Sequence, residues 1–169
     1  KMQYLGEDIS RTLVRKEVLQ GNMKIASTLL GYPYFIQETV KSGNQLGRQM
    51  GIPTINILPP EEKLMPPNGV YISKVEIEDQ TFMGISNIGV KPTVEGVHPL
   101  TVETNIFDYD QDVYGKKVRV YFLSYLRGEK KFQSLEELKN QVNMDIAKAK
   151  EYWSSHRTNE SYYGNITNA

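Results

Sequence analysis

The sequence predicts a mainly β protein, an all-β sandwich or barrel with helices at both ends, and three observations support this. Between Tyr34 and Arg127, short runs rich in Val, Ile, Tyr, Phe and Thr are separated by clusters of Gly, Pro, Asn and Asp. The segments before and after this region carry apolar residues at helical spacing. The chain has 169 residues, 39% hydrophobic and 24% charged, which is typical of one folded domain with its own core.

Two short helices are predicted before the β-rich region. Ser10 is suited to cap a first helix that ends at Gly21. Asn22 is suited to cap a second helix that ends at Gly31.

Six strands are predicted, near residues 34–40, 54–57, 69–77, 81–87, 100–107 and 117–125. Alternation assigns one face of the fifth strand to Leu100, Val102, Thr104 and Ile106 and the other to Thr101, Glu103, Asn105 and Phe107. The sixth strand has a second alternating set, Val118, Val120 and Phe122.

The strand at 69–77 changes phase. Val70 and Ile72 share one face, whereas Val75 and Ile77 fall on the other. Either a bulge or burial on both sides of the strand would explain this pattern.

A final helix follows the strands. Ser134 and Glu137 form a capping box at its start. Its apolar face, expected to lie on the barrel, consists of Leu135, Leu138, Val142, Ile146, Ala149 and Trp153. The residues from Ser154 onward form a polar tail without periodicity.

Composition excludes several classes of function. Twenty Lys and Arg balance twenty Asp and Glu, which argues against a nucleic-acid-binding barrel even though eleven Tyr offer stacking rings. There is no Cys, and there are two His, so thiolate metal sites, a cysteine nucleophile and a His-rich metal site are excluded. No apolar run approaches the roughly 18 residues of a membrane span and no signal-peptide pattern opens the chain, so we expect a cytoplasmic protein without a membrane partner.

A glycine-rich segment is the first candidate binding element. P-loop and dinucleotide-binding glycine motifs are absent, but Gly43, Gly47 and Gly51 would let backbone amides approach anionic oxygens, and Arg48 adds a cation. A plain hairpin connection is the alternative interpretation.

Three further positions could carry chemistry. Thr54 and Asn56 lie on one face of a strand and offer neutral oxygens to a hard cation such as Mg²⁺, unless they are only the polar face of an edge strand. Glu103 could accept a proton from a substrate hydroxyl, or be a solvated surface carboxylate. Arg127 could be a planar fork held over a ligand, or a surface cation.

Taken together, these segments resemble the riboflavin kinase family. The run Gly51-Ile52-Pro53-Thr54-Ile55-Asn56 is similar to the family signature G-x-P-T-A-N, with Ile55 in place of the small residue. The resemblance covers roughly residues 31–153 and rests on ordered blocks at 43–57, 67–71, 87–93, 102–108 with 112–115, and 126–132.

The resemblance implies a closed, six-stranded antiparallel Greek-key barrel with a C-terminal helix. It implies transfer of the γ-phosphate of ATP to the 5′-hydroxyl of riboflavin, giving FMN and ADP. Thr54 and Asn56 would hold Mg²⁺ and the ATP phosphates, the loop with Gly43, Gly47, Arg48 and Gly51 would fold over them, Glu103 would be the general base, and Arg127 would border the flavin. A non-catalytic flavin- or nucleotide-binding barrel is the alternative.

The N-terminal segment extends the resemblance. Residues 9–15 are similar to the end of the FMN adenylyltransferase module of bacterial bifunctional enzymes, although Arg11 replaces a Ser of that segment. We therefore expect a helical remnant of that module at 1–33, the kinase barrel and its helix at 34–153, and a polar tail at 154–169. Adenylyltransferase activity is not expected.

Overall fold

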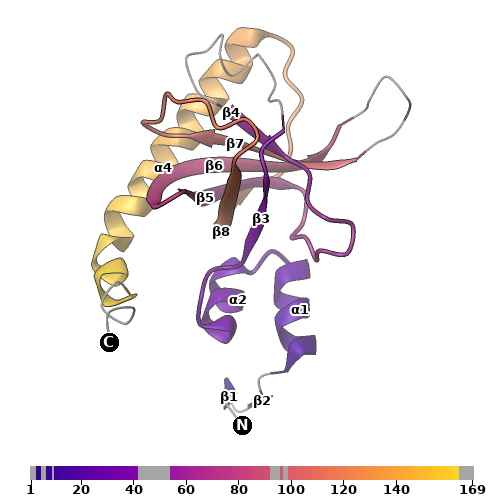
Figure 1. The fold of residues 1–169 in the computed structure, drawn as a ribbon, viewed down its shortest axis with the longest axis vertical. Coiled ribbons are helices and arrows are strands. Elements are labelled where there is room, and N and C mark those ends of the chain that lie inside the picture. Colours follow the sequence, from indigo (N-terminus) through magenta and orange to yellow (C-terminus); the bar gives the residue numbers. More distant parts are fainter. Residues whose placement is uncertain are drawn as a thin grey trace. The chain divides into compact units, whose positions relative to one another are not determined.

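The computed structural model describes residues 3–4, 7–8, 10–41, 54–91, 96 and 99–163. They belong to two compact units, Lys1–Lys130 and Lys131–Ala169. The elements of the first unit (Figure 1) are β1 (Gln3–Tyr4), β2 (Glu7–Asp8), α1 (Arg11–Leu19), α2 (Met23–Leu30), β3 (Phe35–Thr39), β4 (Thr54–Ile57), β5 (Gly69–Ile77), β6 (Gln80–Val90), β7 (Leu100–Ile106) and β8 (Lys117–Arg127). The second unit holds α4 (Leu135–Tyr163).

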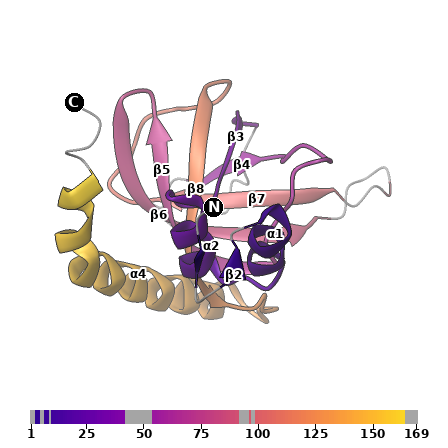
Figure 2. The ribbon, with the colours of Figure 1, turned by 90° about the horizontal axis from the view of Figure 1, so that it is seen from below.

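The six predicted strands form one antiparallel sheet in the order β3-β8-β5-β6-β7-β4. Strands β5, β6 and β7 are consecutive neighbours, and β8 returns to lie beside β5, which is the Greek-key arrangement. Figure 2 shows the strands curving around a common interior. The predicted Greek-key fold is confirmed.

The two end strands of this order meet at a single point. Lys41, just after β3, forms an isolated bridge with Asn56 of β4, and its N–H donates to the Asn56 carbonyl at 2.8 Å. Among the described residues, closure of the barrel is therefore one bridge and not a full ladder.

The core lies on the inner face of the sheet. Its strand members include Ile55 and Ile57 of β4, Val102 and Ile106 of β7, and the predicted set Val118, Val120 and Phe122 of β8. The alternation predicted for β7 and β8 is confirmed, because the alternate side chains of each strand reach this cluster.

Of the two predicted explanations for the phase change in β5, burial on both sides of the strand is the one that the structure shows. Val70, Tyr71, Ile72 and Ser73 are all buried, so this part of the strand is covered on both faces. The register with β8 also shifts twice, between Val70 and Tyr71 and between Ile72 and Ser73. The extra residues belong to β8, which skips Leu126 and Leu123.

Both N-terminal helices begin and end near the predicted residues. The hydroxyl of Ser10 accepts a hydrogen bond from the Leu13 N–H at 3.2 Å, and Gly31 ends α2 in a left-handed conformation. Asn22 occupies the N-cap position of α2 but makes no capping bond, and its Nδ2 donates to Oε2 of Glu17 at 2.7 Å.

One helical residue belongs to the barrel core. The side chain of Met23, at the start of α2, is 2% exposed and lies in the same cluster as Tyr71 and Phe122. The helix pair is thus packed on the barrel within the first unit.

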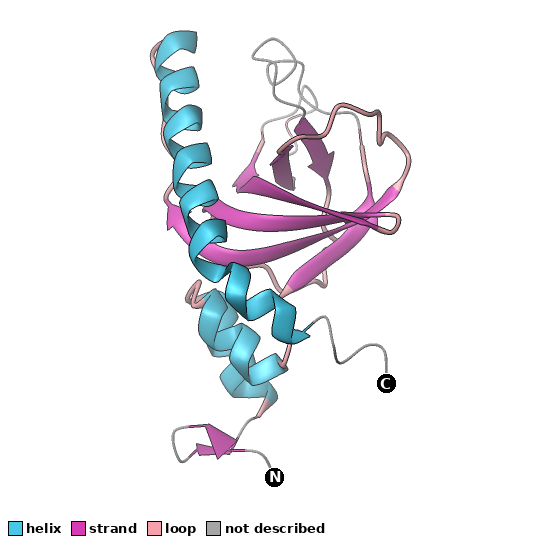
Figure 3. Cartoon of the chain, turned by 90° about the vertical axis from the view of Figure 1, so that its left-hand side faces the viewer, coloured by secondary structure: helices cyan, strands magenta, loops and turns pink. Residues whose placement is uncertain are grey.

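Helix α4 is longer than predicted (Figure 3). The hydroxyl of Ser134 accepts from the Glu137 N–H at 3.1 Å, and the Glu137 carboxylate accepts from the N–H of Gln133 at 2.9 Å. The helix continues past Trp153 to Tyr163, into the segment predicted as a polar tail. That its apolar face lies on the barrel stays a prediction.

Candidate active site

Two residue pairs face each other across β4 and β7. The register sets Thr54 opposite Asn105 and Asn56 opposite Glu103. Ile55 and Ile57 are buried in the core, so Thr54 and Asn56 point to the other face of the sheet, as the alternation predicts. Glu103 and Asn105 share that face, because Val102 and Ile106 also belong to the core.

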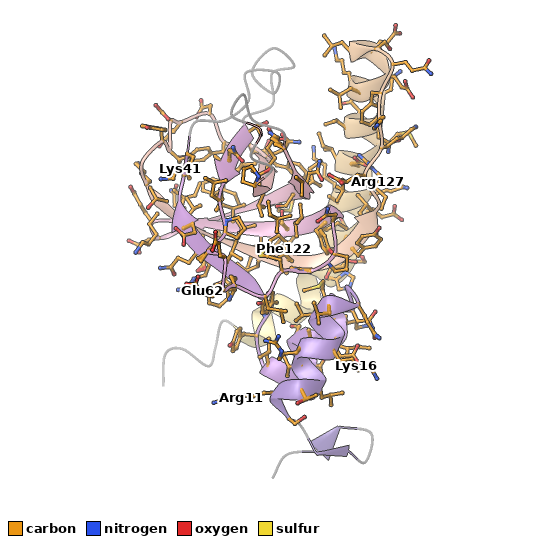
Figure 4. The ribbon with its side chains drawn as sticks, turned by 90° about the vertical axis from the view of Figure 1, so that its right-hand side faces the viewer. Arg11, Lys16, Lys41, Glu62, Phe122 and Arg127 are labelled. Carbon is orange, nitrogen blue, oxygen red and sulfur yellow. The ribbon has the colours of Figure 1, made fainter. Side chains whose placement is uncertain are left out.

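The Glu103 position is one member of a row that runs across the sheet. Asn87 of β6 is paired with Glu103, Val70 of β5 with Asn87, and Arg127 of β8 with Val70. Directly paired residues point to the same face, so this row, which we call the polar row, has Asn56 at one end and Arg127 at the other. Figure 4 shows Lys41, the bridge partner of Asn56, and Arg127 on opposite sides of the barrel, with Phe122 between them.

An amide oxygen at one end of the row has no partner. In the part of the chain that the structure describes, no hydrogen-bond partner is found for the buried Oδ1 of Asn56. Buried oxygens are normally paired, so this one marks a position where a ligand would complete the site. Next to it, the Thr54 hydroxyl donates to Oδ1 of Asn105 at 2.6 Å, which fixes the orientation of the Thr54 oxygen.

These two oxygens fit a hard divalent cation. Neutral side-chain oxygens are among the ligands that Mg²⁺ accepts, and substrate phosphates and water complete its shell. No group of three or more His, Asp or Glu gathers among the described residues, and the carboxylate beside this pair in the ladder is that of Glu103, opposite Asn56.

Glu103 is held by a lysine that the sequence analysis did not select. The Nζ of Lys91, the residue after β6, lies 2.6 Å from Oε1 of Glu103. The Glu103 side chain is 20% exposed, so it is accessible from the outer face. A partly exposed carboxylate with one oxygen engaged still has a second oxygen to accept a proton.

Arg127 lies at the opposite end of the polar row. Its Nη1 donates to the carbonyl of Gly128 at 3.0 Å, and it is separated from Glu103 by β5 and β6. At about 4.8 Å per strand, the two side chains start some 14 Å apart. Val70, which lies between them in this row, is 5% exposed, so the outer face of the sheet is covered at that point.

The residue after Gly128 also reaches this face. The carboxylate of Glu129 lies against Gly89 of β6 so closely that a Cβ at position 89 would overlap it. Only glycine fits at position 89 with Glu129 in this place.

The structure brings together Thr54, Asn56 and Glu103 and places Arg127 in the same row. The predicted phosphate-binding residues Gly43, Gly47, Arg48 and Gly51 lie outside the described residues. Residues missed by sequence reasoning are Lys91, Asn87 and Asn105. Asn105 could have been found, since it is two residues from Glu103 on the same strand face.

The fold and the row define a class of protein: an antiparallel Greek-key barrel whose outer face carries a carboxylate, a buried amide oxygen and an arginine. The family model for riboflavin kinase (flavokinase) matches residues 30–153, and the chain belongs to this family.

Curated relatives of this chain include bifunctional proteins. The riboflavin kinase/FMN adenylyltransferase of Bacillus subtilis is 35% identical over 159 residues, covering 93% of this chain and 50% of the relative. That of Haemophilus influenzae is 38% identical over 148 residues, covering 87% and 47%. The chain thus spans about half the length of the curated relatives it matches.

Two solved structures share the fold. A macrolide-efflux protein from Streptococcus pneumoniae has a TM-score of 0.79 and 36% identity, covering 88% of this chain and 48% of that one. A riboflavin kinase from Trypanosoma brucei has a TM-score of 0.54 and 22% identity, covering 76% and 84%, a likeness of fold alone. In the part of the chain that the structure describes, no helix has the length and apolar character to cross a membrane.

Proposed function

We propose that this chain is an ATP-dependent riboflavin kinase that transfers the γ-phosphate of ATP to the 5′-hydroxyl of riboflavin, giving FMN and ADP. The observation that carries the proposal is the pairing of Glu103 with Asn56, whose Oδ1 is buried and unpartnered, in a chain of the riboflavin kinase family. A proton acceptor and a cation ligand thereby stand side by side. The proposal covers the kinase alone and includes a cytoplasmic location.

Glu103 is the general base of this proposal. The 5′-hydroxyl oxygen of riboflavin forms a bond to the γ-phosphorus, the bond from that phosphorus to the bridging oxygen of ADP breaks, and the hydroxyl proton passes to Glu103. Phosphoryl transfer depends more on alignment and charge stabilisation than on a strong base, so one carboxylate is sufficient.

Thr54 and Asn56 are the proposed ligands of Mg²⁺ bound with ATP. Mg²⁺ neutralises charge on the β- and γ-phosphates when bound. The chain contributes a fixed pair of oxygens, because Thr54 is held by Asn105 and Asn56 lies in the ladder with β7.

The remaining contacts divide between the two ends of the polar row. We place the phosphates at the Asn56 end, and we assign Gly43, Gly47, Arg48 and Gly51 to phosphate binding, as the family resemblance implies. We place the flavin toward Arg127, whose guanidinium can stack on a planar ring.

The proposal is tested by incubating the protein with riboflavin, ATP and Mg²⁺ and separating the products by chromatography. FMN is expected in the complete mixture and not in samples with EDTA or without protein. If riboflavin fluorescence is quenched on binding but no FMN forms, the chain is a non-catalytic flavin-binding barrel and the proposal is wrong.

A further inference from the structure

The ion pair between Lys91 and Glu103 joins a lysine outside the strands to the proposed base. Its two atoms lie 2.6 Å apart, a short charge-assisted contact. The Lys91 side chain is 37% exposed and that of Glu103 20% exposed. Pairs this exposed contribute little to folding, so stability alone does not account for the contact.

The backbone holds Lys91 where it can make this contact. The ladder between β6 and β7 ends at the pair Val90 and Leu100, and one more bond, from the Lys91 N–H to the Pro99 carbonyl at 3.2 Å, continues it. Lys91 is therefore fixed at the exit of β6.

Strand geometry explains why the contact is made across a glycine. Asn87, Gly89 and Lys91 alternate onto the face that carries Glu103, and Asn87 is the direct partner of Glu103. Lys91 starts about 13 Å further along β6, so the pair forms only because both side chains extend toward each other. Gly89, between them on β6, has no side chain of its own, and the carboxylate of Glu129 lies against it.

The contact engages one oxygen of the carboxylate. Lys91 binds Oε1, and no other hydrogen bond or ion pair to Glu103 is found among the described residues. The neighbours of Glu103 in the polar row, Asn56 and Asn87, are neutral amides. Lys91 is thus the charged group that sets the orientation of this carboxylate.

We propose that Lys91 is a positioning residue for Glu103: it holds Oε1 so that Oε2 faces the hydroxyl of the acceptor and takes its proton. This inference rests on the proposed kinase function. It predicts that Lys91 acts through Glu103 and not through the phosphates of ATP.

The test compares kcat and KM for Lys91→Met, Lys91→Arg, Glu103→Gln and the double variant with Lys91→Met and Glu103→Gln. We expect Lys91→Met to lower kcat about 10-fold with the KM values for ATP and riboflavin nearly unchanged. Lys91→Arg should restore most of the loss. In the Glu103→Gln background, Lys91→Met should cause no further loss, since the group it orients is gone.

Lys116→Met is the matched control. Lys116 forms another exposed ion pair, with Glu78 at 3.0 Å, at the opposite end of β5 from the polar row. It should leave kcat unchanged, and both lysine variants should unfold at the denaturant concentration of the wild type.

Three results would overturn the inference while leaving the kinase intact: wild-type kcat in Lys91→Met, a raised KM for ATP with kcat preserved, or equal losses with and without Glu103. If Glu103→Gln turns over like the wild type, both the base and its positioning residue are wrong. If the wild type forms no FMN, the proposed function fails and the inference fails with it.

Discussion

At Asn56, a feature that lowers stability is one that would serve ligand binding. Its Oδ1 is buried without a hydrogen bond, although its backbone is part of the ladder with β7 and its carbonyl accepts from Lys41. An unpaired buried oxygen costs about 1–3 kcal/mol of stability. A site that binds a cation would retain such an oxygen in spite of this cost.

Asn56→Leu keeps the branching at Cγ and removes the unpaired oxygen. We expect the free energy of unfolding to stay the same or rise by about 1 kcal/mol, because no hydrogen bond is lost. The affinity for ATP in the presence of Mg²⁺ should fall at least about 10-fold. Denaturant unfolding and ATP titration measure the two effects on the same sample.

Asn56→Asp provides the contrast. A carboxylate here should lower stability in EDTA, because its charge is buried without a partner, and Mg²⁺ with ATP should restore part of the loss. Loss of stability in Asn56→Leu, with unchanged ATP affinity, would contradict the assignment of Asn56 as a ligand.

At the scale of the elements, the start of β5 is the most constrained backbone. Gly69 has a φ of +146°, which side chains rarely adopt. A Cβ there would lie 2.7 Å from the carbonyl oxygen of Arg127 and 2.7 Å from the ring of Tyr125. The approach of β5 to β8 beside Arg127 therefore depends on this glycine.

Gly69→Ala should destabilise the protein by about 3 kcal/mol, since it combines an unfavourable φ with a clash against backbone. Gly31→Ala is the matched control: Gly31 has a φ of +82° but nothing within 4 Å of the added Cβ, so only the conformational cost of about 1 kcal/mol applies. Equal losses in the two variants, measured by denaturant unfolding, would show that the close contact contributes nothing.

The elements that could be predicted are those whose signal is local. The bounds of β4 and β5 match the predicted residues, because alternation and flanking turn residues mark them. The double bulge could not be predicted, since the extra residues Leu123 and Leu126 are in the partner strand and appear only in the register. The last ten residues of α4 were missed because they have no apolar periodicity.

At the scale of the whole molecule, the barrel core includes a residue outside the matched kinase region. The family model begins at residue 30, yet Met23 of α2 is buried among core residues of the barrel. We expect Met23→Ala to lower the free energy of unfolding by about 2–5 kcal/mol.

Met144→Ala is the control for this prediction, because the Met144 side chain is 54% exposed and its truncation should change stability by less than about 0.5 kcal/mol. The two variants are compared by thermal or denaturant unfolding. A Met23→Ala protein as stable as Met144→Ala would mean that α2 is not part of the folding unit of the barrel.

The site could be predicted in its parts but not in its assembly. The spacing of Thr54 and Asn56 predicted that both lie on one face of the same strand. Alternation predicted the same for Glu103 and Asn105 on another strand. That β4 lies next to β7, and that Lys91 reaches Glu103, follows from strand order and register, which no short stretch of sequence encodes. The polar row is a property of the folded sheet.

The role of Glu103 as general base is tested most directly by Glu103→Gln, with riboflavin binding measured by fluorescence quenching and turnover by FMN formation. We expect wild-type affinity for riboflavin and a kcat lower by about 10²–10⁴-fold, because the amide cannot accept the hydroxyl proton. Turnover equal to that of the wild type would contradict the placement of phosphoryl transfer at Glu103.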